Sequence, residues 1–171
     1  MASRILNDSP LRRGFTPIQS GFTLIELIIS ISITLLLVGG VVSNYNAFNE
    51  TQLLTQTALT LKNNFRLAQV KAVAVEKPSS GCTQLIGYRV TFDTSSYATQ
   101  AQCTEGPVGG ISSVRLPDGV TFSPIPGAAT FAVLSGALAN GAPVSVTLMG
   151  RQRSYLLQIS TNGTVADMGL Q

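Results

Sequence analysis

The chain has 171 residues, of which 44% are hydrophobic and 11% charged, against about 25% charged residues in typical soluble domains. This length accommodates one domain plus an additional helix, and the low charge density argues against a disordered chain and an ordinary cytosolic enzyme. The formal net charge is +3, but Arg4, Arg12 and Arg13 all lie near the start. Residues 22–171 hold eight Lys and Arg against seven Asp and Glu. The basic balance is therefore poor evidence for a nucleic-acid partner.

Residues that could support catalysis or metal binding are scarce. There is no His, and the two cysteines, Cys82 and Cys103, are too few for a zinc site and do not form a CxxC pair. Without His there is no Ser-His-Asp set, and most carboxylates fall in predicted turns or on a polar helix face. No glycine-rich element follows a predicted strand and opens a helix, so no phosphate loop is indicated. We expect no enzyme activity, no metal and no cofactor.

Residues 22–42 form an apolar run that contains one charge, Glu26. As a helix rising about 1.5 Å per residue, the run would be roughly 30 Å long and would match the hydrocarbon core of a bilayer. The upstream arginines favour a cytoplasmic leader and export of the remainder. A secretory signal would be shorter and would be followed by a small-residue cleavage site. A plain signal anchor explains length and orientation, but it leaves a carboxylate in the membrane without a reason.

The sequence Gly-Phe-Thr-Leu-Ile-Glu-Leu at residues 21–27 resembles the processing motif of type IV prepilins and type II secretion pseudopilins. The resemblance implies that a prepilin peptidase cuts after Gly21 and methylates the new amino terminus at Phe22, while the apolar run stays on the product. It also implies that Glu26 pairs with the terminal amine of a neighbouring subunit in a filament. Such pairing suits a buried carboxylate, because an unpaired one is costly.

An amphipathic helix is predicted to continue through residue 77 and to end at Pro78, because apolar and small residues recur at alternating steps of four and three. This stripe either buries against the protein's own sheet or also packs against other subunits. Gly39-Gly40 lowers helix stability by about 1 kcal/mol per glycine. The family resemblance implies a helix that partly melts on assembly, and we expect that melting at this glycine pair. The stripe comprises Ala47, Thr51, Leu54, Ala58, Leu61, Phe65, Ala68, Ala72 and Val75, and the polar face carries Gln52, Gln56, Lys62, Asn63, Arg66 and Lys77.

After residue 81 the hydrophobic period changes to two, which predicts short strands separated by turns. A long helix followed by antiparallel strands is an α+β arrangement, and by resemblance it is the type IV pilin fold. Residues 106–110 and 123–129 are predicted loops. The expected division is a leader at 1–21, a transmembrane and filament-core helix at 22–43, its amphipathic continuation at 44–77 and a β-rich domain at 78–171. The expected strands are 85–92, 96–102, 113–116, 130–134, 144–149 and 154–160.

Cys82 and Cys103 bracket the first predicted hairpin. Outside the cytoplasm such a pair usually forms a disulfide, which would stabilise the fold by roughly 3 kcal/mol in the chain-entropy model. The alternative is two unpaired buried thiols. Many major pilins carry their disulfide near the C-terminus, so this early pair argues against a principal filament subunit of that type.

Three later segments, 68–72, 116–120 and 150–165, resemble regions of the GspH/FimT-like minor pilins and pseudopilins, although Val70-Lys71 replaces a usual small and acidic pair. In members that serve natural transformation a G-R-x-R element binds DNA, and residues 150–153 match it. Arg151 and Arg153 would point the same way and clamp successive phosphates. The alternative is that they solubilise a sheet edge.

The sequence thus predicts a minor pilin or pseudopilin of a type IV pilus or a type II secretion pseudopilus. Its expected partners are the prepilin peptidase, other pilin subunits, the inner-membrane assembly platform and the lipid bilayer. We expect a single-pass protein of the bacterial inner membrane, with its C-terminal domain outside the cytoplasm, that later enters a filament. One alternative is a DNA-binding minor pilin for DNA uptake, acting through Arg151 and Arg153. Another is a pseudopilin that contacts secreted substrates.

Overall fold

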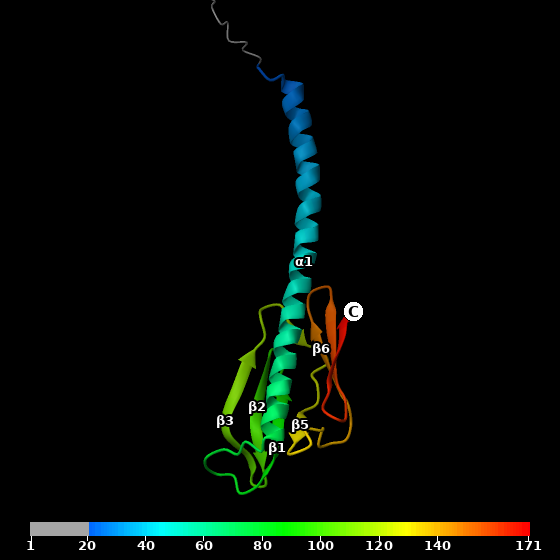
Figure 1. Cartoon of the computed structure of the whole chain (residues 1–171). Helices are drawn as coiled ribbons and strands as arrows, with labels where there is room; N and C mark the ends of the chain where they lie inside the picture. Colours follow the sequence, from blue (N-terminus) through cyan, green and yellow to red (C-terminus); the bar gives the residue numbers. More distant parts are fainter. Residues whose placement is uncertain (1–20) are drawn as a thin grey trace, which may run out of the picture. The chain divides into compact units, whose positions relative to one another are not determined.

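The computed structural model describes residues 21–171, except for the side chains of residues 40–44. The predicted leader, with Arg4, Arg12 and Arg13, therefore lies outside the described residues apart from Gly21. The chain forms two compact units, one ending at Val41 and the other spanning residues 42–171. One helix, α1 (Leu24–Val73), begins in the first unit and ends in the second (Figure 1).

In the first unit, α1 exposes every side chain from Leu24 to Gly39. Its hydroxyl side chains from Ser30 to Thr34 are hydrogen-bonded within the helix. The hydroxyl groups of Ser30, Ser32 and Thr34 each donate to the carbonyl oxygen four residues earlier, at 2.7–2.8 Å. Apart from Glu26, this segment therefore presents an apolar surface on all sides, because the hydroxyl groups need no outside partner.

Within residues 21–171, as far as they are described, no helix combines the length and the apolarity that crossing a membrane requires. The assignment of residues 22–43 to a membrane stays a prediction.

The second unit contains two antiparallel four-stranded sheets, with strand orders β3-β2-β1-β5 and β4-β6-β7-β8. The second half of α1 lies across both sheets (Figure 1). This is the α+β arrangement that the sequence predicts, with a helix packed on an antiparallel β-sheet domain. The strands are β1 (Leu85–Phe92), β2 (Ser96–Cys103), β3 (Gly106–Arg115), β4 (Thr121–Phe122), β5 (Ala129–Ala132), β6 (Val144–Met149), β7 (Ser154–Ile159) and β8 (Val165–Leu170).

The predicted stripe of α1 forms the centre of the core. Strands β6 and β7 alternate buried and less buried residues along their length, as a half-buried sheet requires. Phe65 contacts Phe92 edge to face at 6.0 Å between ring centroids, and Phe92 contacts Phe122 in the same way at 5.3 Å. These rings join the helix to both sheets, because Phe92 ends β1 and Phe122 ends β4. The stripe residues that are fully buried are Leu54, Ala58, Leu61, Phe65, Ala68 and Ala72.

The end of the helix differs from the prediction. Helix α1 ends at Val73, before Pro78, and Val75 is exposed with a φ of 52°. The Glu76 N–H donates to the Lys71 carbonyl and the Val75 N–H to the Ala72 carbonyl, which is the Schellman pattern of a helix C-terminus. Hydrophobic spacing alone does not report this local stop, so Val75 was wrongly included in the stripe.

The predicted set of strands needs three corrections. The predicted loop at 106–110 is the first half of β3, which pairs with β2 at the edge of its sheet. This segment lacks period-two hydrophobicity because most of β3 is exposed. Strands β4 and β8 were not predicted. The first has only two residues, and the second is buried mainly at its first residue, Val165.

Candidate functional site

The N-terminal motif forms the first turn of α1. Thr23 precedes the helix, and its hydroxyl oxygen accepts the N–H of Glu26 at 3.3 Å. This places Thr23 at the N-cap and Glu26 three residues later, the spacing of a capping box. The Glu26 carboxylate lies where the helix dipole favours negative charge. Gly21, Phe22 and Glu26 are all exposed, so the predicted cleavage site and the predicted assembly carboxylate are both accessible in this chain.

Cys82 and Cys103 form a disulfide, with their Cα atoms 5.6 Å apart. The bond ties the segment after α1 to the end of β2. Close by, the Glu105 carboxylate accepts the Thr83 N–H with both oxygens, at 3.1 and 3.2 Å. Hydrogen bonds from Thr83 lower the pKa of Glu105 to about 2. The alternative interpretation of the sequence, that Cys82 and Cys103 are two unpaired thiols, is therefore wrong.

Arg151 and Arg153 lie in the turn between β6 and β7 and are exposed. We call residues 150–153 the arginine turn. It is anchored to α1 by Glu50, whose Oε1 accepts the N–H of Gln152 at 2.7 Å and that of Arg153 at 3.2 Å. The hydrogen bond from Gln152 is the main cause that lowers the pKa of Glu50 below its usual value.

Gly150 makes this anchoring possible. A Cβ atom at this position would lie 2.4 Å from the Glu50 Oε1 and 3.2 Å from the Leu54 Cδ1. A side chain at position 150 would thus displace the Glu50 carboxylate, and the hydrogen bonds of the anchor come from backbone N–H groups and not from the arginine side chains. Sequence reasoning missed Glu50, because 102 residues separate it from Gln152.

A hollow of about 530 Å³ lies beside the arginine turn. Asn46, Ala47 and Glu50 of α1 line one side, and Asp118 and Arg151 are also among its lining residues. The arginine turn therefore lies close to residues 46–50 of α1, because both line the same hollow. The lining of the hollow contains two acidic side chains, Glu50 and Asp118, and one basic side chain, Arg151, so it is not a basic pocket.

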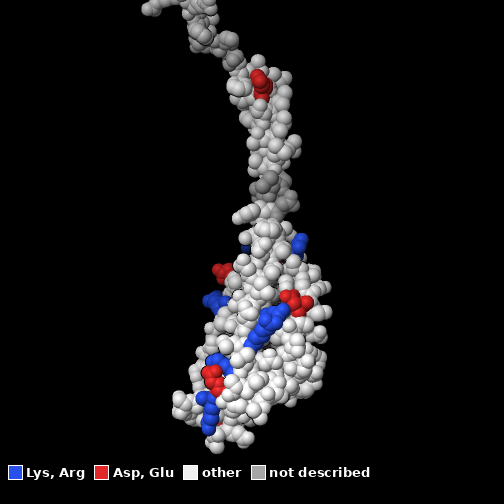
Figure 2. Space-filling view, viewed as in Figure 1, with Lys and Arg blue, Asp and Glu red and all other residues white. Residues whose placement is uncertain are grey.

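Two of the other cations of this unit pair with carboxylates. Lys62, expected on a solvated face, is half-buried and pairs with Asp167 at 3.8 Å, and Lys71 pairs with Glu76 at 3.3 Å. On the visible face of the second unit, basic and acidic side chains alternate (Figure 2). Arg151 and Arg153 are thus two of several exposed cations of this unit, which also include Arg89 and Arg115.

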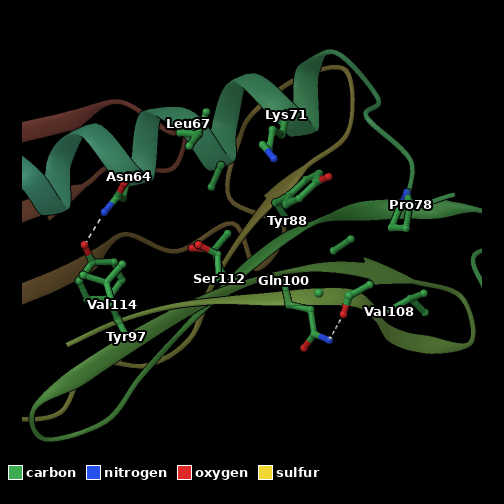
Figure 3. Close-up of a pocket in the computed structure, with 15 residues that line it drawn as sticks. Asn64, Leu67, Lys71, Pro78, Tyr88, Tyr97, Gln100, Val108, Ser112 and Val114 are labelled. Carbon is green, nitrogen blue, oxygen red and sulfur yellow. Dashed lines mark hydrogen bonds between the residues drawn. The ribbon is translucent and has the colours of Figure 1, made fainter. Parts of the chain in front are cut away.

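A second cleft, of about 240 Å³, lies between α1 and strands β2 and β3 (Figure 3). Asn64 donates a hydrogen bond to the hydroxyl of Tyr97, and the Lys71 ammonium lies 5.8 Å from the Tyr88 ring centroid. Burial is the main cause that raises the pKa of both tyrosines. The two phenols are thus neutral at pH 7 and are not activated as nucleophiles.

Residues 17–42 match the family described as the prokaryotic N-terminal methylation motif. The match covers the predicted cleavage site, Glu26 and the apolar run, and it includes only the first residue of the second unit, Val42. No curated protein and no solved structure matches the chain.

Proposed function

Since this chain is a type IV pilin-like protein by its N-terminal methylation motif, we propose that it is a minor pilin or pseudopilin that a prepilin peptidase processes and that assembles into a helical filament. The cut falls between Gly21 and Phe22, and Phe22 is methylated. The observation that carries the proposal is the first turn of α1, where Glu26 is the one carboxylate on a helix segment that is otherwise apolar on every side.

The surface of this segment supports lateral packing between subunits. Leu24 and Leu36 are 77% and 79% exposed, so apolar surface is left without a partner in the chain itself. Burial of such surface is favourable at roughly 25 cal/mol per Å². The same surface suits the bilayer that would hold the subunit before assembly, with residues 22–43 as the single membrane span.

The disulfide supports a location for the second unit outside the cytoplasm, because disulfides persist in oxidising compartments. In this proposal the second unit faces outward from the filament or lies at its tip. The remaining partners are the assembly platform of the inner membrane and, for a secretion pseudopilus, secreted substrates. The likeness of residues 68–72, 116–120 and 150–165 to GspH/FimT-like proteins favours a minor subunit.

The assembly role of Glu26 is tested by Glu26→Leu in the full chain, expressed in cells that hold the peptidase and the filament system. We expect processing to continue and incorporation into filaments to be lost, because the new amine has no carboxylate partner. Ser32→Ala is the matched control and should assemble normally, because the Ser32 hydroxyl bonds only within its own helix. Glu26→Leu filaments that form at wild-type levels would contradict the role of Glu26.

A DNA-uptake function is the second candidate, and the exposure of both arginines on an anchored turn favours it. Arg151→Gln with Arg153→Gln should weaken binding of the full chain to duplex DNA in a gel-shift assay. The dependence of log affinity on log salt should fall by about 0.9 per lost phosphate contact. Arg89→Gln with Arg115→Gln removes the same charge from exposed positions elsewhere. Equal losses for the two pairs would show a non-specific charge effect and exclude a dedicated clamp.

A further inference from the structure

Strand β3 lies at the end of its sheet, with β2 as the neighbour that pairs with it. The Leu116 N–H donates to the Ser95 carbonyl at 2.8 Å and so points towards β2. In an antiparallel ladder this direction alternates from one residue to the next. The backbone N–H and C=O groups of Ser113 and Arg115 therefore point away from β2, to the open edge. Among residues 21–171 no strand covers this edge.

The open edge carries little protection against pairing with another chain. Exposed edge strands usually carry charges or bulges that hinder such pairing. With ten residues β3 is the longest of the described strands, and Arg115 is its one charged residue. A shift of register leaves residues 109–111 without direct partners in β2, whereas residues 112–115 pair regularly. The bulge thus disrupts the first part of the edge and leaves residues 112–115 open.

Two hollows lie between this part of β3 and α1. The first is the cleft of about 240 Å³, whose lining includes Ser112 and Val114 (Figure 3). It lies over Ser112 and its β2 partner Thr99, whose small side chains leave space beneath α1. The second hollow, of about 210 Å³, is lined by Val114 and Leu116 and by Thr60 of α1. Residues 112, 114 and 116 alternate along the strand, so all three face α1.

A strand added beside β3 would meet both features at once. Its backbone would pair with the free N–H and C=O groups of Ser113 and Arg115. Its residues opposite Ser112 and Val114 would form the non-hydrogen-bonded pairs, with Cα atoms about 4.5 Å apart and side chains on the α1 face. Alternate side chains of the added strand thus reach the two hollows. In this mode of recognition, main-chain hydrogen bonds give affinity and the pockets give selectivity.

The lining of the hollows defines the chemistry of the added strand. Among the residues that line the first hollow Lys71 alone is charged, and its ammonium lies 3.3 Å from the Glu76 carboxylate. The first hollow therefore suits an uncharged, apolar side chain. A second copy of β3 does not supply one, because Ser112 is small and Leu116 is buried in its own subunit. At the end of the strand, Arg115 favours an acidic residue opposite it.

We propose that residues 112–115 of β3 bind an extended segment of a partner polypeptide as an additional strand, and that the two hollows bind apolar side chains at alternate positions of that segment. The partner segment is therefore extended, apolar at every second residue and not positively charged. This inference goes beyond the proposed function and needs only the second unit. It holds for the unprocessed chain as well as for a filament subunit.

The test uses the unprocessed full chain in detergent and a dye-labelled peptide of eight residues, in which leucine alternates with threonine and the last residue is aspartate. We expect saturable binding in fluorescence anisotropy. A peptide of the same composition with consecutive leucines enters micelles equally well and should not bind saturably. N-methylation of the threonines removes the N–H groups that face β3 and should weaken binding roughly tenfold or more. N-methylation of the leucines, whose N–H groups face away, is the matched control and should be tolerated.

Variants of the chain test the same contacts from the other side. Ser113→Pro removes an outward N–H and keeps the bonds to β2, so it should weaken binding roughly tenfold. Ser113→Thr keeps that N–H and should bind as the wild type does. Ser112→Phe fills the first hollow and should weaken binding of the alternating peptide. Unfolding midpoints show whether each variant is folded, and the N-methylated peptides probe the hydrogen bonds on the unchanged chain.

Several outcomes would overturn the inference. Absence of saturable binding by the alternating peptide is one, and equal affinity of the two N-methylated peptides is another. Self-association of the chain that Ser113→Pro abolishes, without peptide binding, would show that the edge serves a second copy. None of these results concerns processing or Glu26, so the filament subunit would stand. Conversely, a chain that the peptidase leaves uncut still binds the peptide if the inference is correct.

Discussion

The two halves of α1 have the same secondary structure but different surroundings. Between Leu24 and Gly39 every residue is exposed, whereas seven residues of the second half, among them Leu54 and Ala72, are buried. The second half has a one-sided stripe and folds against its own chain. The first half is apolar on all sides and has no such partner in its own unit. A single helix thus contains one segment made for internal packing and one made for an external environment.

The carboxylates follow the same division. In the second half, Glu50 accepts two N–H groups from the arginine turn and so connects α1 to the β6–β7 hairpin. In the first half, Glu26 is exposed next to the helix start. The contrast indicates that Glu50 serves the fold of one subunit, and it agrees with the proposal that Glu26 serves contacts between subunits.

The largest expected effect is the difference in unfolding free energy between two truncations, one of a large apolar side chain in each half of α1. Phe65→Ala should lower the free energy of unfolding of the second unit by about 3–5 kcal/mol, because Phe65 is fully buried. Leu36→Ala should change it by less than about 0.5 kcal/mol, because Leu36 is 79% exposed. Denaturant unfolding of the full chain in detergent, followed by circular dichroism, measures both. Similar losses for the two variants would contradict the division.

The disulfide should contribute to the second unit alone. Cys82→Ala with Cys103→Ala should lower its unfolding free energy by roughly 3 kcal/mol, since the cysteines are separated by 21 residues. Reductant should destabilise the wild type by a similar amount and leave the double variant unchanged. A wild type that is insensitive to complete reduction would show that the bond contributes little.

The smallest expected effect is a pH dependence at Glu105. Hydrogen bonds from Thr83 lower its pKa from 4.5 to about 2 in the folded chain. A lowered folded pKa stabilises above the unfolded pKa, so this contribution is complete above pH 4.5 and is lost as the pH falls towards 2. Glu105→Gln should remove this part of the pH dependence in unfolding curves recorded across that window. Parallel curves for variant and wild type would exclude the contribution.

The sequence predicts well those elements that bury one face, because their hydrophobic residues recur at a regular spacing. The stripe from Leu54 to Ala72 and strands β1, β6 and β7 show a clear period and were placed within one residue at most of their ends. Strand β3 was half missed, because an exposed edge strand rich in Gly and Ser has no hydrophobic pattern to detect. Its pairing with β2 is a tertiary effect.

The candidate site divides in the same way. Gly21, Phe22 and Glu26 belong to one short motif that can be recognised without a structure. The pairing of Cys82 with Cys103 was the favoured prediction, because the chain has two cysteines and was predicted to be exported. Glu50 was not predictable, because its role depends on a contact with the N–H groups of a turn about a hundred residues later. Nearly every residue type supplies a backbone N–H, so the sequence does not show which N–H groups bind Glu50. Gly150 is the one sequence sign of this contact, because a side chain there would collide with Glu50.

The central claim is that the exposed apolar half of α1 belongs to a processed filament subunit. Its most direct test is the intact mass and N-terminal sequence of the chain after expression with a prepilin peptidase. We predict a product that begins at Phe22, carries one added methyl group and retains the apolar run, and Gly21→Leu should leave the chain uncut. A chain that keeps residues 1–21 in the presence of active peptidase, or one cut after the apolar run, would contradict the account.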